Sequence, residues 1–180
     1  KPINGFVAQW EGLLARLRVS SSNLNIGCVG AGAGGIEILL AIQYRLRTDL
    51  AVVGETAAHI KFHLFTDSND ILMSHNPAAR FRFNRILADR GIEVHKRSKV
   101  VGVTEGAIEC ESGSRFELDE ILWVTPAAAA SWLKNDTKLR LDNSGFIAVK
   151  DTLVSESHPN IFAAGDTASV AAYPRPKAGV

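Results

Sequence analysis

The stretch Gly30-Ala31-Gly32-Ala33-Gly34-Gly35-Ile36-Glu37 decides the fold expected for this chain. Its glycines fit the spacing G-x-G-x-x-G, with Gly30, Gly32 and Gly35 at the three defining positions. The first glycine permits a tight turn, the second lets a pyrophosphate approach the backbone, and the third lets a helix pack on a strand. The stretch therefore predicts a dinucleotide-binding turn, to which Gly34 also belongs.

The segments on either side of the turn provide the context that this motif requires. Residues Leu24–Val29 form an apolar run that predicts a buried strand, and residues 36–47 have apolar side chains at helical spacing. The N-terminus of that helix would offer free N–H groups and the positive end of its dipole to a pyrophosphate. The alternative is a glycine-rich turn without a ligand.

The rest of the chain continues the alternation of strands and helices. We expect a leading helix over residues 5–18, a helix over 77–90 opened by Asn76 and Pro77, and strands over 60–65, 92–95, 121–124 and 146–149. Residues 100–117 predict a meander of short strands. This order is typical of an α/β protein with a Rossmann-like, doubly wound parallel sheet and a small antiparallel β-meander.

An acidic side chain near the end of the second strand usually binds the ribose hydroxyls of such a nucleotide. The strand ends at Phe65, Thr66 and Asp67, so Asp67 is the candidate and Thr66 is the position just before it. The alternative for Asp67 is an ordinary residue that opens a turn. No Arg lies between Phe65 and Ala79 to bind a 2′-phosphate, which favours NAD over NADP.

Glu37 is expected in the first turn of the helix that follows the glycines. A carboxylate at that place interacts favourably with the helix dipole, which is one explanation for the residue. The other explanation is that its side chain lies near the nicotinamide.

Composition argues against several other classes of function. The chain has 180 residues and a net charge of +1, which gives no general attraction to nucleic acid or to anionic membranes. Cys28 and Cys110 form no C-x-x-C pair, and none of the five histidines has metal-ligating neighbours in the sequence, so we expect no metal. There is neither a signal peptide nor an apolar run long enough to span a bilayer, and we expect a cytoplasmic protein.

Three motifs in this order resemble the pyridine nucleotide-disulfide oxidoreductase family. They are the glycine turn with Glu37, the strand end Ile121-Leu122-Trp123-Val124-Thr125-Pro126, and the segment His158-Pro159-Asn160-Ile161-Phe162-Ala163-Ala164-Gly165-Asp166. Within this family the chain is similar to the type II NADH dehydrogenase-like members. It resembles still more the flavoprotein module found beside selenide, water dikinase, a subgroup suggested by the tail 175–180.

The resemblance implies contacts with two cofactors, NAD(P)H and FAD. In the family, an NAD(P)H domain is inserted into an FAD domain, and a Gly-Asp segment returns the chain to the FAD domain. Asp166, preceded by Gly165, would then bind the ribityl chain of the flavin, and Glu37 would lie close to the nicotinamide. The family's Ala-Thr-Gly strand end passes near the dinucleotide. Here its last two positions are Thr125 and Pro126, and Pro126 has no N–H to donate.

The resemblance also divides the chain into segments. We expect a leading helix or interdomain segment in residues 1–19, an NAD(P)H-binding Rossmann domain in 20–150, and the start of the returning FAD-domain segment in 151–180. Within the last segment, residues 160–164 would form a strand and residues 167–172 would begin a helix. No initiator Met and no FAD-binding glycine fingerprint precede the turn at Gly30, so we expect a piece of a longer protein that is inactive alone.

The implied function is hydride transfer from NAD(P)H to FAD and electron transfer on to a quinone or a disulfide-type acceptor. We identify no acid, base or nucleophile in the sequence, because the chemistry belongs to the cofactors. A homodimer and peripheral membrane association of the parent protein are compatible with the resemblance. Two alternatives are a non-catalytic module that senses NAD(H) and an S-adenosylmethionine-binding methyltransferase. The Gly165-Asp166 segment argues against the methyltransferase.

Overall fold

The chain forms two compact units, Lys1–Thr125 and Pro126–Val180, each with an apolar core of its own. The computed structural model describes residues 3–19, 23–52, 59–125 and 128–174.

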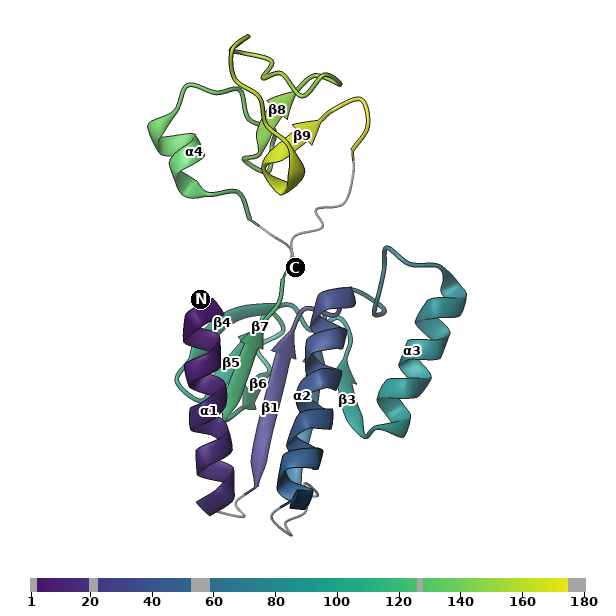
Figure 1. The fold of residues 1–180 in the computed structure, drawn as a ribbon. Coiled ribbons are helices and arrows are strands. Elements are labelled where there is room, and N and C mark those ends of the chain that lie inside the picture. The colour runs from purple at the N-terminus through teal and green to yellow at the C-terminus, as the bar shows by residue number, and fades with distance from the viewer. Residues whose placement is uncertain (1–2, 20–22, 53–58, 126–127, 175–180) are drawn as a thin grey trace. The chain divides into compact units, whose positions relative to one another are not determined.

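The first unit is built on a four-stranded parallel sheet with the strand order β3-β2-β1-β7 (Figure 1). Its strands are β1 (Leu24–Val29), β2 (Ile60–Phe65), β3 (Ile92–His95) and β7 (Glu120–Trp123). β1 pairs with β2 on one side and with β7 on the other, so the strand order reverses at β1. Ligands of open parallel sheets bind beyond the carboxyl ends of the strands at such a point.

Three helices pack in one core with the sheet: α1 (Ile3–Val19), α2 (Ala33–Val52) and α3 (Pro77–Asp89). Side chains of a strand alternate between the two faces, and Phe62 and Leu64 of β2 share this core with Ile36 of α2. α3 begins where the sequence predicts, because the side chain of Asn76 accepts a hydrogen bond from the backbone N–H of Ala79 (2.8 Å). No helix in the described part of the chain is long and apolar enough to cross a membrane.

A β-meander packs on the face of the parallel sheet opposite to the helices. Its three antiparallel strands are β4 (Val100–Thr104), β5 (Ala107–Cys110) and β6 (Arg115–Glu117). Ile108 and Phe116 of the meander share a second core with Val29 of β1 and Phe65 of β2. Helices, sheet and meander thus form the three layers of a Rossmann-like unit, and the predicted fold is confirmed.

The second unit is small. It contains α4 (Ser131–Asp136), β8 (Ile147–Val149), the 3-10 turn η2 (Gly165–Thr167) and β9 (Ala168–Val170). β8 and β9 are parallel neighbours. The core is formed by Leu133, Ile147, Val149, Ala163 and Ala168, so buried residues lie on both sides of η2 in the sequence.

Two expectations for the second unit were wrong. Residues 160–164 are not a strand, and among them only Phe162 forms an isolated bridge, to Val154. The residues after η2 form β9 and do not begin a helix, because β8 supplies a partner strand about twenty positions earlier in the chain, with Ile147 opposite Ala168. The short apolar runs in this region did not distinguish helix from strand by their period.

The division of the chain also differs from the expected boundary at residue 150. Residues of α4 and β8 belong to the core of the second unit, so the Rossmann-like unit ends at Thr125. The leading helix α1 belongs to the first unit, where Leu13 is buried in the core of the sheet. Which unit serves which cofactor stays a prediction.

Candidate functional site

The glycine turn is held between two strand ends by backbone contacts. Gly30 has a φ of +116°, and its N–H donates to the carbonyl oxygen of Phe65 at the end of β2 (2.9 Å). A Cβ on Gly30 would collide with the carbonyl of Val124, just beyond β7, and a Cβ on Gly35 would collide with the carbonyl oxygen of Gly30. Glycine is therefore required at both positions by the turn itself.

Gly32 differs from these two glycines, because a Cβ at this position would meet no atom within 4 Å. Gly32 is exposed and immediately precedes α2, and its carbonyl oxygen accepts a hydrogen bond from the N–H of Ile36 (3.1 Å). Gly34 lies in the first turn of α2. The first N–H groups of a helix have no partners within it, and the helix dipole is positive there. The open space at Gly32 thus adjoins a place that favours an anion.

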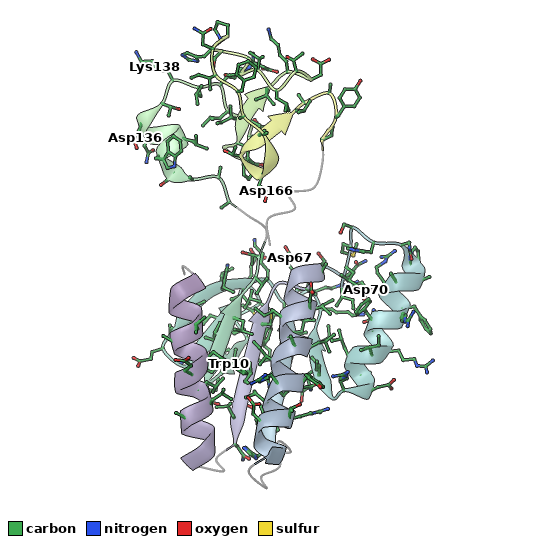
Figure 2. The ribbon with its side chains drawn as sticks, in the orientation of Figure 1. Trp10, Asp67, Asp70, Asp136, Lys138 and Asp166 are labelled. Atoms are coloured by element: carbon green, nitrogen blue, oxygen red, sulfur yellow. The ribbon has the colours of Figure 1, made fainter. Side chains whose placement is uncertain are left out.

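The end of β2 lies beside this turn. Thr66 is buried, and its hydroxyl accepts a hydrogen bond from the N–H of Ser68 (3.2 Å). Asp67 is exposed, and its carboxylate accepts from the hydroxyl of Ser68 (3.0 Å). Figure 2 shows Asp67 at the edge of the sheet to which the strand arrows point. The contact with ribose remains a prediction for both Thr66 and Asp67.

A basic loop between β3 and β4, residues 96–99, contacts the turn formed by residues 66–68. The sequence did not reveal this contact. The N–H of Arg97 donates to the carbonyl oxygen of Ser68 (2.9 Å), and that of Ser98 donates to the carbonyl oxygen of Thr66 (2.7 Å). An arginine thus adjoins the turn that carries Asp67, although none lies between Phe65 and Ala79 in the sequence. A cation at this place attracts a 2′-phosphate, which opposes the NAD preference inferred from the local sequence.

Two lysines of the basic loop are already paired with carboxylates. Lys96 contacts Asp70 (2.7 Å) and Lys99 contacts Glu111 (2.8 Å). Hydrogen bonds from Lys96 and Asn84 lower the pKa of Asp70 to about 2, so this carboxylate is charged at neutral pH. Lys96 thus joins the loop to the segment that follows Asp67, and Lys99 joins it to the meander, whereas no ion pair is found for the exposed Arg97 of this described loop.

The end of β7 lies on the other side of the glycine turn. The N–H of Val124 donates to the carbonyl oxygen of Val29, the last residue of β1 (2.9 Å). Thr125 is exposed, and its hydroxyl accepts a hydrogen bond from the indole N–H of Trp123 (2.8 Å). Thr125 is thereby placed at the carboxyl edge of the sheet. Pro126 and the tail 175–180 lie outside the described residues.

Glu37 does not lie in the first turn of its helix, so that expectation was wrong. α2 begins at Ala33, and its first turn contains no acidic residue. The dipole effect falls off within one turn, which weakens the dipole as an explanation for Glu37. Its side chain instead lines a cavity of about 390 Å³, together with Leu40 of α2, Phe83 of α3 and the intervening His75.

The Gly-Asp segment of the second unit forms the turn η2. Gly165 has a φ of +66°, and a Cβ there would meet no atom within 4 Å. Asp166 follows it and is half-buried (Figure 2). The turn therefore combines room for close approach to its backbone with a carboxylate on the next residue.

Both turns lie in a region that matches a known family. Residues 13–178 match the pyridine nucleotide-disulphide oxidoreductases. The chain belongs to this family. Both the glycine turn and the Gly165–Thr167 turn lie within the matched residues.

Two relatives of this chain are named as an NADH dehydrogenase-like protein and an NADH:quinone oxidoreductase. An NADH dehydrogenase-like protein of Mycobacterium tuberculosis is 27% identical over an alignment of 159 residues that covers 84% of this chain and 37% of the relative. The type II NADH:quinone oxidoreductase of Haemophilus influenzae is 24% identical over 84% of this chain and 35% of its own length. The chain thus spans little more than a third of these relatives.

Solved structures of oxidoreductases share the fold. NDH2 from Plasmodium falciparum in complex with NADH has a TM-score of 0.70 and 16% identity, over 82% of this chain and 32% of that one. An engineered water-forming NADPH oxidase bound to NADPH has a TM-score of 0.61 and 22% identity, over 81% of this chain and 30% of that one. At these identities the likeness shows the architecture alone.

Neither cysteine of this family member has the surroundings of a reactive thiol. Cys28 and Cys110 are both free and buried. Burial raises the pKa of Cys28 to about 12, so its thiol stays protonated at neutral pH. Cys28 lies in the core between sheet and helices and acts there as a small apolar side chain.

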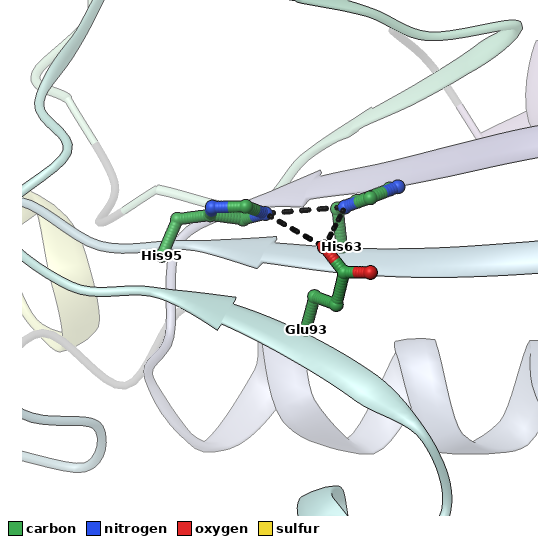
Figure 3. A group of neighbouring side chains, drawn as sticks. All are labelled: His63, Glu93 and His95. Atoms are coloured by element: carbon green, nitrogen blue, oxygen red, sulfur yellow. Dashed lines mark hydrogen bonds and ion pairs between the residues drawn. The ribbon is translucent and has the colours of Figure 1, made fainter.

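One group of polar side chains was missed in the sequence. His63, Glu93 and His95 place three ligand atoms within 4.8 Å of one another (Figure 3). The sequence pattern did not indicate that two histidines and a carboxylate meet here. The two histidines are 32 positions apart and meet only because β2 pairs with β3. Glu93 and His95 are two positions apart on one strand and therefore share a face, which was the signal available in the sequence.

Proposed function

We propose that this chain is the NAD(P)H-binding part of an FAD-dependent oxidoreductase. The observation that carries the proposal is the open space at Gly32, which lies at the start of α2 between the carboxyl ends of the strands. A helix start of this kind binds the pyrophosphate of dinucleotides in Rossmann folds. Family membership supports the same function.

The residues around the turn have different roles in this proposal. Gly32 and Gly34 leave the backbone at the start of α2 accessible to the pyrophosphate, whereas Gly30 and Gly35 shape the turn. Asp67 accepts hydrogen bonds from ribose hydroxyls, with Thr66 supporting its turn.

The nicotinamide end of the nucleotide is assigned by resemblance to Glu37, Thr125 and Pro126. The exposure of Thr125 at the carboxyl edge of the sheet supports its part of this assignment.

The flavin contact belongs to the second unit in this proposal. The open space at Gly165 and the carboxylate of Asp166 suit the ribityl hydroxyls of FAD, which are hydrogen-bond donors to a carboxylate. The nicotinamide and the flavin supply the hydride chemistry when they are bound, and the chain binds and orients them.

A quinone is the first candidate for the electron acceptor of the whole protein, with a disulfide as the alternative. The name of the Haemophilus influenzae relative, a type II NADH:quinone oxidoreductase, supports the quinone. We place the parent protein in the cytoplasm, with peripheral association with a membrane and a homodimer as further proposals. Two free, buried cysteines suit a reducing compartment.

A non-catalytic module that senses NAD(H) is the remaining alternative, because it would need the same glycine turn. A methyltransferase is not supported, since residues 13–178 match an oxidoreductase family. Flavin reduction in the parent protein separates the sensor from the enzyme. A parent protein that binds NADH and FAD but shows no flavin reduction would favour the sensor.

The chain is expected to bind NADH more tightly than NADPH, because the carboxylate of Asp67 repels a 2′-phosphate. A like-charge contact at about 4 Å costs about 1 kcal/mol in water, or about fivefold in affinity. Fluorescence titration of both nucleotides measures the preference. Asp67→Ala should reduce it, and Arg97→Ala should weaken NADPH alone. Tighter binding of NADPH by the unaltered chain would contradict the assignment.

Glu37→Gln in the parent protein is expected to slow flavin reduction about tenfold or more, which corresponds to about 1.4 kcal/mol of barrier. Its position beyond the first turn of α2 predicts little change in the melting temperature. Stopped-flow absorbance gives the rate, and Glu11→Gln on α1 is the matched control. An unchanged rate with a lower melting temperature would assign Glu37 to the helix.

Asp166→Ala is expected to release FAD from the parent protein, because it removes the acceptor for the ribityl hydroxyls. The absorbance of the flavin bands after gel filtration measures retention. Asp151→Ala changes an exposed aspartate of the same unit and should keep the protein yellow. An Asp166→Ala protein that retains its flavin would place the contact elsewhere.

A further inference from the structure

His63 of β2 and Glu93 and His95 of β3 form a compact group of potential metal ligands (Figure 3). The Nδ1 atom of His63 lies 3.1 Å from Nε2 of His95 and 3.5 Å from Oε2 of Glu93, and these last two atoms are 3.9 Å apart. All three distances join the same three atoms, so the ligand atoms form a triangle around one point.

The size of this triangle suits a zinc ion. A circle through three points with these spacings has a radius of about 2.0 Å, which is the usual length of a Zn–N or Zn–O bond. Two imidazoles and one carboxylate are also a donor set that binds zinc, with the fourth position left for water. Both the spacing and the chemistry of the three side chains therefore fit the same ion.

The sheet holds the three side chains in this arrangement. In the parallel pairing of β2 with β3, His63 is opposite Glu93 and Phe65 is opposite His95. Side chains two positions apart on a strand share a face, so all three ligands project from one side of the two strands. The geometry is set by strand pairing and needs no rearrangement of a loop.

Aromatic side chains fix one of the two imidazoles. The ring of His95 stacks on Phe65 with 4.5 Å between centroids and packs against Phe116 of the meander at 4.7 Å. The side chains of His63 and His95 are 12% and 20% exposed, whereas that of Glu93 is 61% exposed. An ion can thus be reached from solvent on the side of Glu93 and is bounded by packed rings elsewhere.

Two charged side chains, Lys61 and Glu93, act on His63. The positive charge of Lys61 opposes a cation, and the carboxylate of Glu93 offsets that charge.

We propose that His63, Glu93 and His95 form a binding site for a divalent transition metal, with zinc as the best fit. The ion ties the edge strand β3 to β2. It lies immediately before the basic loop, which begins at Lys96 and contacts the turn that carries Asp67. The site is separate from the glycine turn, so it does not depend on the nucleotide assignment.

Zinc titration of the metal-free chain by calorimetry tests the proposal. We expect one equivalent to bind and the melting temperature to rise with zinc. His95→Gln and Glu93→Gln should each lower the affinity by more than the roughly 10–100-fold that loss of an outer-sphere partner costs. His158→Gln and Glu105→Gln change exposed or half-exposed residues elsewhere and should bind zinc like the unaltered chain.

Glu93→Gln is the decisive variant, because Glu93 is largely exposed and its replacement leaves the packed rings intact. Circular dichroism confirms the fold of each variant, and the intensity of the visible absorption of bound Co²⁺ reports whether the ion is four-coordinate. The proposal is overturned if the unaltered chain binds no zinc, which would leave the two rings joined by a hydrogen bond. It is also overturned if Glu93→Gln and His95→Gln bind zinc with unchanged affinity.

Discussion

A Gly32→Val variant is expected to fold like the unaltered chain and to lose NADH binding by about 100-fold or more. A Cβ at Gly32 meets no atom within 4 Å, so the fold has room for a side chain there. That room is the space proposed for the pyrophosphate, and a valine side chain would occupy it. Fluorescence titration with NADH measures the loss, and a melting curve shows that the variant is folded.

Gly12→Val is the matched control for this variant. Gly12 is exposed on α1, and a Cβ there also meets no atom within 4 Å. It should leave NADH affinity unchanged, because α1 is not part of the proposed site. If the folded Gly32→Val chain binds NADH normally, the pyrophosphate does not approach this turn.

Gly30→Ala is expected to destabilise the chain by about 2–6 kcal/mol. A φ of +116° is strained for any residue with a Cβ, and the new methyl group would also collide with the backbone carbonyl of Val124. Relief would require β1 and the segment after β7 to separate, which would break the hydrogen bond from Val124 N–H to Val29. Urea denaturation, followed by circular dichroism, measures the change in the free energy of unfolding.

Gly12→Ala provides a control with the opposite sign. In an exposed helix interior, alanine is favoured over glycine, and the substitution should stabilise the chain by about 0.4–1 kcal/mol. Equal stability of Gly30→Ala and the unaltered chain would mean that the turn can adopt another conformation. Gly30 and Gly32 are thus expected to affect different measurements, stability for one and binding for the other.

Arg97 shows how a specificity argument changes once the strands are assembled. The sequence shows no Arg between Phe65 and Ala79 that could bind a 2′-phosphate. The structure instead brings a loop from beyond β3 into backbone contact with Ser68 and Thr66. The carboxyl ends of parallel strands meet at one edge of the sheet, so the loops after β2 and β3 both lie beside Asp67.

The local pattern of the sequence determined most of the elements of the first unit. The boundaries of β1, β2 and β3 match the predicted runs, because each is a short run of apolar or alternating residues bounded by polar residues or glycine. Asn76 and Pro77 likewise determined the start of α3, since capping depends on residues within one turn. The glycine spacing identified the turn, because the backbone conformation of Gly30 excludes other residues.

Only the tertiary structure decided the features that depend on residues far apart in the chain. β9 forms a strand because β8 pairs with it, and the apolar run of its own residues did not specify this. His63 meets Glu93 and His95 through the register of β2 with β3, and Arg97 reaches the turn that carries Asp67 through a hydrogen bond to Ser68. Hydrophobic periodicity and capping act over a few residues, whereas strand pairing and loop contacts depend on how the whole sheet assembles.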